Sequence, residues 1–518
     1  MNGSSKRWLL AYSLFVMIVT SAPYWLGFAS AGTEWTFSGF VIGVDDGNSY
    51  LAKMLLGSAG DWLFRSPYTT LPQPGVLVFV PYLLLGKLAG GPGLHLQLVG
   101  LFHLFRLAAI PLLVYAIDQF AAQFNMSEVW RRWVTILGTL GGGLGWLLLA
   151  FGRGQAWGEM PLAFISPESF GFLALYAVPH LAMARALLLL ALSNYLQSGG
   201  GSGHRWRSGL LALATFLVNP LTGVSLALVV GAHQVALILA RRSTAEWRLA
   251  AIRLLLPAAP YVAYLGLAAL TDPFLQGWAA QNQVRSPAPA YYLLAYGLLL
   301  PWVVVGFRKL ADRRPVDLLP AVWVLALPLL AYAPVGIQRR LPEGGWVALA
   351  VMAAWGLEQI RAQPIRRSLR LGLVGLAMPA TAILLAGGLQ VAAAPAEPAF
   401  APADRTLAYR WLAEQAAVGE IALASFRTSN ELPAWAHLRV PIGHGPESVG
   451  LAGARRSVDQ FFQTDNWQER RAIGESLGAN WAIFEKLVPA LASEAVPQGW
   501  QLAGRWGAVA VLRLEAQP

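Results

Sequence analysis

Long apolar runs constrain the fold of this chain more strongly than any other feature of its sequence. Segments 8–28, 133–151 and 372–393 are examples, and each has the roughly 17 to 25 residues that a helix needs to cross a bilayer. Hydrophobic residues make up 56% of the 518 residues, and charged residues only 13%. Because backbone groups in lipid must be hydrogen-bonded within the protein, helices are the expected spanning elements. The sequence therefore predicts a polytopic α-helical membrane protein.

The basic residues predict how these helices are oriented. The formal net charge is +11, but Lys and Arg fall in short clusters between the apolar runs, as in the cytoplasmic loops of membrane proteins. We interpret the charge as topology and not as a nucleic-acid surface. Placing every cluster inside gives about eleven spans, a cytoplasmic N-terminus and an extracytoplasmic C-terminal segment. The clusters are Lys6 with Arg7, Arg131 with Arg132, and segments 205–207, 241–253, 308–314 and 361–370; the outer loops lie near 29–96, 153–171, 219–223, 271–289 and 335–344.

One apolar run, 75–88, does not fit this topology. It contains Pro81, and its length of about 14 residues is short of the roughly 20 that spanning needs. We predict a non-spanning helix at the outer membrane interface. The first extracytoplasmic loop then covers about 29–96 and holds two further amphipathic candidates, 49–56 and 62–64.

The composition changes near residue 394, after which the sequence is mixed and charged. A Pro/Ala-rich linker at 393–403 separates the transmembrane domain, 1–393, from a soluble extracytoplasmic domain, 394–518. Asp404 is a candidate cap for a helix over 407–416. Segments 421–425, 438–442 and 481–485 are predicted strands. The prediction is a small α/β domain.

Asp45 and Asp46 are the first candidates for chemistry. These adjacent carboxylates follow the first span and precede the amphipathic segment 49–56. This is the position at which a membrane enzyme would meet a substrate at the outer membrane surface. In the structural alternative, Asp46 caps the following helix and Asp45 is solvated. The chain has no cysteine, which excludes disulfides, thiolate metal ligands and cysteine nucleophiles.

Three short segments, 46–54 (DGNSYLAKM), 338–344 (QRRLPEG) and 430–436 (NELPAWA), carry a family resemblance. In this order, and with this layout of loops and spans, the chain resembles the GT-C superfamily of membrane glycosyltransferases. Within it, the chain looks like a bacterial branch with the architecture of the lipid A aminoarabinose transferases and the protein O-mannosyltransferases. Each segment is weakly specific alone, and the resemblance depends on their order.

The resemblance implies transfer of a hexose or pentose from a polyprenyl-phosphate donor to an extracytoplasmic lipid, glycan or protein acceptor. The expected reaction inverts the anomeric centre, with Asp46, or else Asp45, as general base. Some GT-C enzymes hold a divalent metal at this loop, so Asp45 and Asp46 are also where Mg or Mn would bind, although the residues do not require one. Two rivals stay open: a transporter or lipid flippase, and a non-catalytic assembly partner.

Arg339 and Arg340, with Gln338, lie in a predicted outer loop, against the usual charge bias. An Arg fork binds two phosphate oxygens, so these residues are predicted to hold the donor phosphate, with Glu343 orienting them. Binding to lipid headgroups is the alternative.

The remaining substrate-binding candidates have weaker support. Arg106 lies in the second span, where a charge costs a few kcal/mol unless it is paired or snorkels; it either faces the cavity or pairs with a helix end. Arg65 and Tyr68 either line the site or anchor the first loop. Glu159, Glu168 and His180, in or beside the second outer loop, are of second rank. In the C-terminal segment, a concentration of polar and aromatic residues forms an acceptor surface or supports the fold: Trp435, His437, His444 and Glu447.

Overall fold

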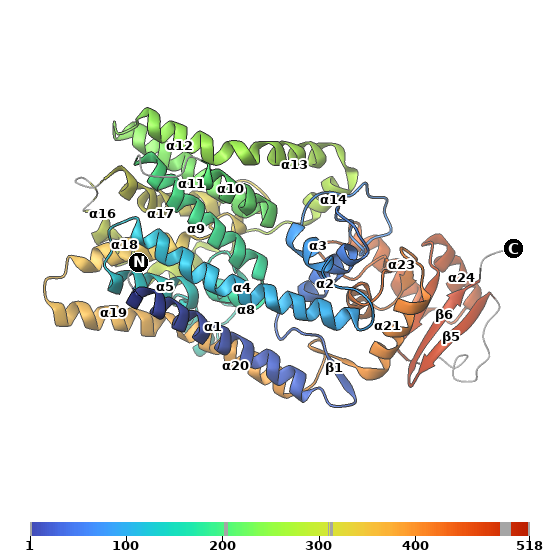
Figure 1. The fold of residues 1–518 in the computed structure, drawn as a ribbon. Coiled ribbons are helices and arrows are strands. Elements are labelled where there is room, and N and C mark those ends of the chain that lie inside the picture. Colours follow the sequence, from blue (N-terminus) through green and yellow to red (C-terminus); the bar gives the residue numbers. More distant parts are fainter. Residues whose placement is uncertain (1–2, 201–205, 309, 311–313, 487–498, 516–518) are drawn as a thin grey trace. The chain divides into compact units, whose positions relative to one another are not determined.

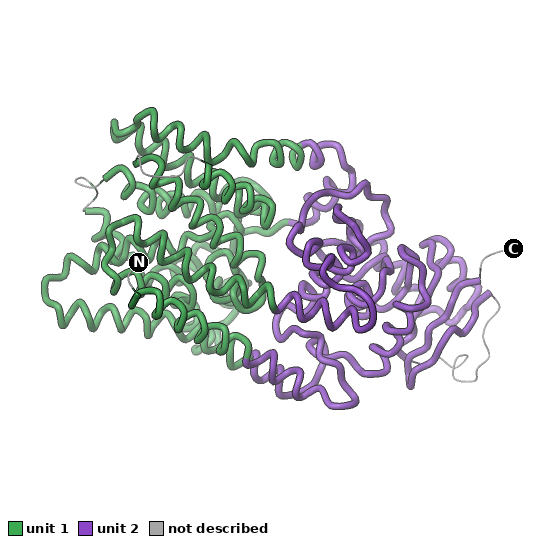
Figure 2. Tube along the Cα trace, in the orientation of Figure 1, with its two compact units in different colours: residues 1–21, 104–266, 283–387 green, residues 22–103, 267–282, 388–518 purple. Residues whose placement is uncertain are grey.

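The computed structural model describes residues 3–200, 206–308, 310, 314–486 and 499–515 (Figure 1). The chain divides into two compact units (Figure 2). Unit 1 contains residues 1–21, 104–266 and 283–387, and unit 2 contains 22–103, 267–282 and 388–518. The C-terminal segment thus shares one unit with the whole predicted first loop, 29–96. The domain boundary at 394 stays a prediction.

Unit 1 is a helical bundle. Four of its helices continue into unit 2: α1 (Gly3–Ser30), α4 (Leu94–Ala122), α13 (Ala259–Thr271) and α20 (Pro379–Ala393). The others lie wholly within unit 1: α5 (Glu128–Leu140), α6 (Trp146–Ala150), α7 (Leu162–Ile165), α8 (Gly171–Ala177), α9 (Pro179–Gly199), α10 (Arg207–Val218), α11 (Pro220–Leu239), α12 (Ala245–Leu255), η1 (Leu256–Ala258), α15 (Pro289–Gly297), α16 (Leu300–Phe307), η3 (Pro315–Asp317), α17 (Leu318–Ala331), η4 (Gln338–Arg340), α18 (Gly345–Glu358) and α19 (Gln363–Ala377).

Five stretches of helix in the described part of the chain are long and apolar enough to cross a membrane. They are Gly3–Ser30, Leu94–Ala122, Pro220–Leu239, Ala245–Thr271 and Gln363–Ala393. A sixth is possible if α15 and α16, which are bent by 75° at their junction, form one broken span. The chain is therefore a multi-pass membrane protein, as predicted. The predicted number of about eleven is not confirmed, because α10 and α18 are apolar but short.

The predicted span 133–151 is broken, because α5 ends at Leu140 and α6 begins only at Trp146. Gly143 lies in this break with φ +64°, and a Cβ there would stand 2.0 Å from the carbonyl oxygen of Ala295. The backbone N–H of Gly142 donates to Ala377 O at 2.8 Å. Segment 141–145 is thus a closely packed break in which the backbone N–H groups of Gly142 and Leu144 are hydrogen-bonded. The prediction of one continuous span over 133–151 is wrong.

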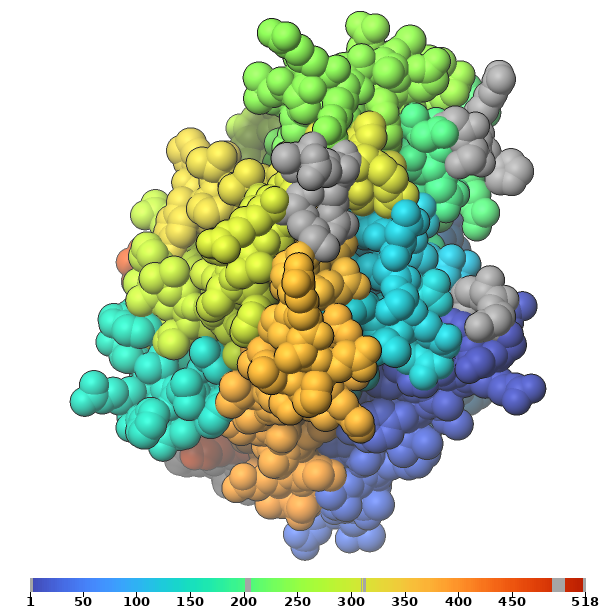
Figure 3. Space-filling model, turned by 90° about the vertical axis from the view of Figure 1, so that its left-hand side faces the viewer, coloured from blue at the N-terminus to red at the C-terminus, as the bar shows by residue number. Residues whose placement is uncertain are grey.

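Described residues of several basic clusters lie at one end of unit 1. The starts of α1, α5, α12 and α19 lie there with the end of α16 (Figure 1), and Figure 3 views this end directly. Arg131 Nη2 donates to Ser5 Oγ at 3.1 Å, and Arg314 Nη2 donates to Gln123 O at 2.9 Å. Basic residues far apart in sequence therefore lie at the same end of unit 1.

Unit 2 combines loop helices with a small sheet. Its elements are β1 (Trp35–Phe37), α2 (Val44–Ser58), α3 (Val80–Gly86), α14 (Pro273–Gln281), β2 (Phe400–Pro402), α21 (Ala403–Gln415), β3 (Ala422–Leu423), α22 (Phe426–Glu431), η5 (Leu432–Ala434), α23 (Leu451–Gln463), α24 (Trp467–Ser476), β4 (Trp481–Phe484), β5 (Trp500–Trp506) and β6 (Val509–Leu514). β1 pairs antiparallel with β2, so the first loop and the C-terminal segment are joined by backbone hydrogen bonds.

The larger sheet has the order β3-β4-β6-β5, parallel between β3 and β4 and antiparallel elsewhere. Side chains alternate between its faces. Trp481 and Ile483 join a core that includes Tyr409 of α21, whereas Phe484 joins a core that includes Phe461 of α23. Helices thus cover both faces, which confirms an α/β region near the C-terminus.

Several local predictions differ from the structure. Segment 438–442 is not a strand, and Arg439 makes only an isolated bridge to Ile421. The helix expected at 407–416 begins at Ala403, so Asp404 lies in its first turn. Only Val80–Gly86 of the run 75–88 is helical, and segment 62–64 forms no helix, because Phe64 pairs with Val76.

Candidate functional site

Asp45 and Asp46 lie in the first turn of α2. The N-cap is Gly43, whose φ of 61° is left-handed, and no side chain caps the helix. The interpretation of Asp46 as the cap is therefore wrong. Helix α2 can start here because Gly47 has no side chain: a Cβ at Gly47 would stand 2.5 Å from the ring of Phe40. The Asp46 side chain is 57% exposed.

A turn at 444–448 in the C-terminal segment faces the Asp46 carboxylate. Nε2 of His444 lies 3.1 Å from Oδ1 of Asp46, and Nδ1 of His444 lies 3.4 Å from Oε1 of Glu447. Backbone bonds from Glu447 N and Ser448 N to His444 O close the turn. Gln281, at the end of α14, donates to the carbonyls of Gly445 and Ser448. The turn is thus fixed from two sides.

Lys53 completes this cluster from the same helix as Asp46. Its Nζ lies 2.5 Å from Glu447 Oε1, which also accepts from Ser49 Oγ at 2.7 Å. Lys53 and Glu447 are 0% and 3% exposed. Asn48 donates to Asn430 Oδ1 at 2.8 Å. Positions 46, 49 and 53 share one face of α2 because they are three and four residues apart.

The charges in this cluster alternate in sign. Burial alone lowers the pKa of His444, but its hydrogen bond to Asp46 and its contact with the charged Glu447 raise that pKa to about 9. Burial raises the pKa of Glu447, and Lys53 and His444 outweigh this and lower it to about 2. Partial loss of hydration beside the cluster raises the pKa of the exposed Asp46 carboxyl, but His444 and Lys53 outweigh this and leave that pKa below its ordinary value. At neutral pH, Asp46 is therefore a carboxylate beside an imidazolium.

The described residues contain no group of three or more His, Cys, Asp or Glu side chains arranged to hold a metal ion. The cluster around Asp46 has two carboxylates, but Glu447 is already committed to Lys53 at 2.5 Å. These residues do not fit a metal centre built from side chains.

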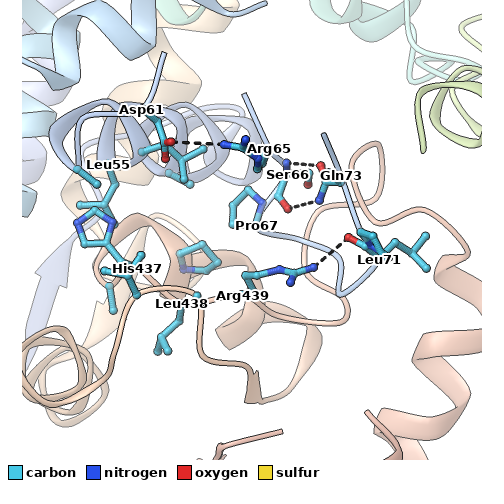
Figure 4. Close-up of a pocket in the computed structure, with 18 residues that line it drawn as sticks. Leu55, Asp61, Arg65, Ser66, Pro67, Leu71, Gln73, His437, Leu438 and Arg439 are labelled. Atoms are coloured by element: carbon cyan, nitrogen blue, oxygen red, sulfur yellow. Dashed lines mark hydrogen bonds and ion pairs between the residues drawn. The ribbon is translucent and has the colours of Figure 1, made fainter. Parts of the chain in front are cut away.

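Arg65 and Tyr68 occupy different surroundings. Arg65 lines a cavity of about 220 Å³ and contacts Asp61 at 3.4 Å (Figure 4). His437 lines the same cavity from the C-terminal segment. Tyr68 is fully buried, its hydroxyl donates to Asn430 O at 3.0 Å, and its ring lies 5.5 Å from that of His444. Tyr68 therefore belongs to the Asp46 cluster, and Arg65 belongs to the neighbouring cavity.

A second polar cluster lies in unit 1. Arg340 is 46% exposed, and its Nε lies 3.7 Å from Oε1 of Glu168. Glu343, predicted to orient Arg339 and Arg340, instead forms a buried ion pair with Arg185 of α9. The Nε of Arg339 is buried without a hydrogen-bond partner among the described residues. The contact between Glu168 and Arg340 thus connects the predicted outer loops 153–171 and 335–344.

Two other candidates have structural roles in unit 1. Arg106 is 1% exposed and donates to Thr20 Oγ1 at 2.9 Å and to Ser21 Oγ at 2.8 Å on α1, so it pairs with a neighbouring helix. Glu159 is exposed, and its backbone oxygen accepts from Tyr291.

The last two candidates, Gln338 and His180, also lie in unit 1. Gln338, with its amide turned to satisfy both partners, donates to Ala333 O at 2.8 Å and accepts from Ser286 N at 3.1 Å. His180 follows Pro179 in the first turn of α9 and is half-buried.

Solved structures of similar fold are membrane glycosyltransferases. Oligosaccharyltransferase AglB from Archaeoglobus fulgidus, in complex with an inhibitory peptide and a dolichol-phosphate, matches with TM-score 0.57 and 12% identity over 93% of this chain and 70% of that one. ArnT from Cupriavidus metallidurans in the apo state matches with TM-score 0.51 and 13% identity over 97% and 98%. The chain has a GT-C fold. The mycobacterial arabinofuranosyltransferase AftD also matches, with TM-score 0.55 and 13% identity over 99% of this chain and 40% of that one.

Sequence comparison finds no matching family model and no curated protein of significant similarity. The likeness to GT-C structures, at 12 to 13% identity, is therefore one of fold.

The sequence alone gives Lys53 and Asn430 no role. For His444 and Glu447 it leaves two roles open, an acceptor surface or support of the fold. One signal was available for Lys53. It stands among apolar neighbours in α2, seven residues after Asp46, and a buried lysine requires an anion. Nothing in the sequence identified Glu447 as that anion, because 394 positions separate the two residues.

Proposed function

We propose that this GT-C-fold protein is an inverting glycosyltransferase that moves a sugar from a polyprenyl-phosphate donor to an extracytoplasmic acceptor. The fold it shares with AglB, ArnT and AftD supports the class of reaction. The observation that carries the proposal is Asp46, a solvent-accessible carboxylate held by an otherwise buried charge cluster. Such a group suits a general base, because it is ionised, oriented and open to an incoming hydroxyl.

In the proposed reaction, a carboxylate oxygen of Asp46 takes the proton of an acceptor hydroxyl as that oxygen attacks the anomeric carbon. The bond between this carbon and the phosphate oxygen breaks on the opposite face, and the phosphate leaves with the bonding electrons. Attack and departure on opposite faces invert the anomeric centre. A positioned base contributes about 10²- to 10⁴-fold to such a step. Asp45, exposed on the same turn, is the second candidate for this role.

Arg340 and Arg339 are proposed to bind the phosphate of the donor. The Arg340 side chain is 46% exposed, and its contact to Glu168 is long, so its guanidinium has donors to spare for phosphate oxygens. The proposed topology, with about eleven spans and a cytoplasmic N-terminus, puts the loops of Asp46 and Arg340 on the extracytoplasmic side. The acceptor is a lipid, a glycan or a protein.

The test is transfer of label from a polyprenyl phosphate carrying a radiolabelled hexose or pentose, in membranes that contain the full chain. We expect Asp46→Asn to lower transfer by about 10²- to 10⁴-fold. The matched control is Asp459→Asn, which neutralises an exposed carboxylate on α23 and leaves transfer unchanged. Equal transfer by the parent, Asp46→Asn and Asp45→Asn would remove both residues from the mechanism.

The rival classes give different outcomes in the same membranes. A transporter or flippase moves the labelled lipid between leaflets without cleaving it, and needs a polar path through the bilayer. A non-catalytic assembly partner supports neither transfer nor movement alone.

A further inference from the structure

Four charged side chains of unit 2 form a chain of alternating sign: Asp46, His444, Glu447 and Lys53. The successive distances are 3.1, 3.4 and 2.5 Å. Three members are buried, with exposures of 5% for His444, 3% for Glu447 and 0% for Lys53. Only Asp46, at the open end, reaches solvent.

This network of four charged side chains is more extensive than stabilisation of the fold requires. Removing an ion from water costs several kcal/mol, and apolar packing of similar volume often serves stability as well or better. Here a lysine and a glutamate are buried together, and a serine hydroxyl adds a hydrogen bond to the same glutamate oxygen. The histidine then extends the network from this oxygen to an exposed carboxylate.

We propose that His444 is a positioning residue, which the buried Lys53–Glu447 pair holds in place and which in turn holds the Asp46 carboxylate in its ionised, reactive orientation. This inference rests on the proposed function, in which Asp46 is the base. Glu447 provides the negative charge that keeps the ring of His444 protonated. The ring provides Asp46 with a hydrogen bond and a positive neighbour.

The groups that face Asp46 determine its pH dependence. His444 and Lys53 favour its ionised form, and Glu447 opposes it; Asp45 is its neighbour on α2. Replacing His444 by Gln keeps an N–H donor of similar reach but removes the charge. The pKa of Asp46 should then rise, so Asp46 should take up its proton at a higher pH than in the parent.

The first test needs no activity. The full chain has seven histidines, so ¹³Cε1-histidine NMR in lipid nanodiscs can follow each ring, and the signal missing from His444→Gln identifies His444. We expect this ring to titrate near pH 9 in the parent, and at lower pH in Glu447→Gln and in Asp46→Asn. A parent value near the ordinary 6.5, or one unmoved by both variants, would overturn the proposal.

The second test is the pH profile of kcat/KM for transfer from the same labelled polyprenyl-phosphate donors. His444→Gln should move the acid limb to higher pH and lower kcat more than it changes KM. His437→Gln, a second histidine of unit 2 that lines the neighbouring cavity, should leave the acid limb in place. If the profile of His444→Gln equals that of the parent after scaling, the role of His444 in transfer is refuted.

The two tests separate two failures. Absence of transfer in every preparation counts against the proposed function, and the histidine titration still decides whether His444 is coupled to Asp46 and Glu447. In the other case, the pKa of His444 shifts as expected in Glu447→Gln and Asp46→Asn, but the acid limb of His444→Gln stays at the parent's pH. The network would then be structural and without effect on the reaction, which also overturns the inference.

Discussion

Removing the charge of Glu447 should destabilise the protein strongly. Lys53 is 0% exposed, and its Nζ lies 2.5 Å from Glu447 Oε1. In Glu447→Gln this ammonium stays buried without its counter-ion, and removing one partner of a buried pair costs about 3–5 kcal/mol. In a folding unit of about 150 to 250 residues, 1 kcal/mol corresponds to about 2–4 °C in Tm. The expected fall in Tm is therefore roughly 6 to 20 °C.

The assay is thermal unfolding of the full chain in nanodiscs, followed by tryptophan fluorescence, as a double-mutant cycle. Lys53→Met and Glu447→Gln should each lower Tm, and the double variant should lose less than the two losses added together, because each single change leaves an unpaired group. The exposed pair Arg455–Asp459, at 3.8 Å, is the control, since surface pairs contribute about 0–1 kcal/mol. A fall in Tm for Glu447→Gln no larger than for Asp459→Asn, or strictly additive falls in the cycle, would show that Lys53 and Glu447 are not a coupled buried pair.

Three further predictions follow from other features. Relative to His444→Gln, the parent should be stabilised by about 3 kcal/mol below pH 6.5, and this advantage should be lost as the pH rises through about 9; Tm differences that are equal at pH 6 and pH 9.5 would contradict this. Arg340→Gln should raise the KM for the polyprenyl-phosphate donor about 10- to 100-fold, since a hydrogen bond to a charged group contributes roughly 1.5–3 kcal/mol; an unchanged donor KM would exclude a phosphate contact. Gly143→Ala should lower Tm by several degrees because its Cβ would meet a carbonyl oxygen at 2.0 Å, whereas Gly231→Ala, in a helix with open space around it, should not; equal Tm values would refute the packed break.

The apolar runs predicted the membrane character because lipid imposes one requirement on every spanning segment, namely that its backbone satisfies itself. The same requirement explains why the predicted span 133–151 is wrong. Segment 133–151 has the composition of one span, but its break is satisfied by backbone partners near residues 294 and 377. Hydropathy depends on composition and does not reveal partners so distant in sequence.

Only the part of the candidate site that lies on α2 could be predicted from the sequence. Asp45 and Asp46 are adjacent in sequence and lie at the start of an amphipathic segment, so local pattern alone identified them. The opposite side, His444 and Glu447, depends on a turn that α14 holds through Gln281. Contacts among segments near residues 50, 280 and 445 are set by tertiary packing, and no local propensity specifies them.

The proposed reaction is cleavage of a polyprenyl-phosphate sugar at the outer membrane surface with Asp46 as the base. The most direct measurement uses purified protein in proteoliposomes with a donor labelled separately in its sugar and in its lipid. We expect the two labels to separate in the parent as acceptor product forms, and to separate at least about 10²-fold more slowly in Asp46→Asn. Labels that stay together while the lipid crosses the bilayer, or that separate at equal rates in both proteins, would contradict it.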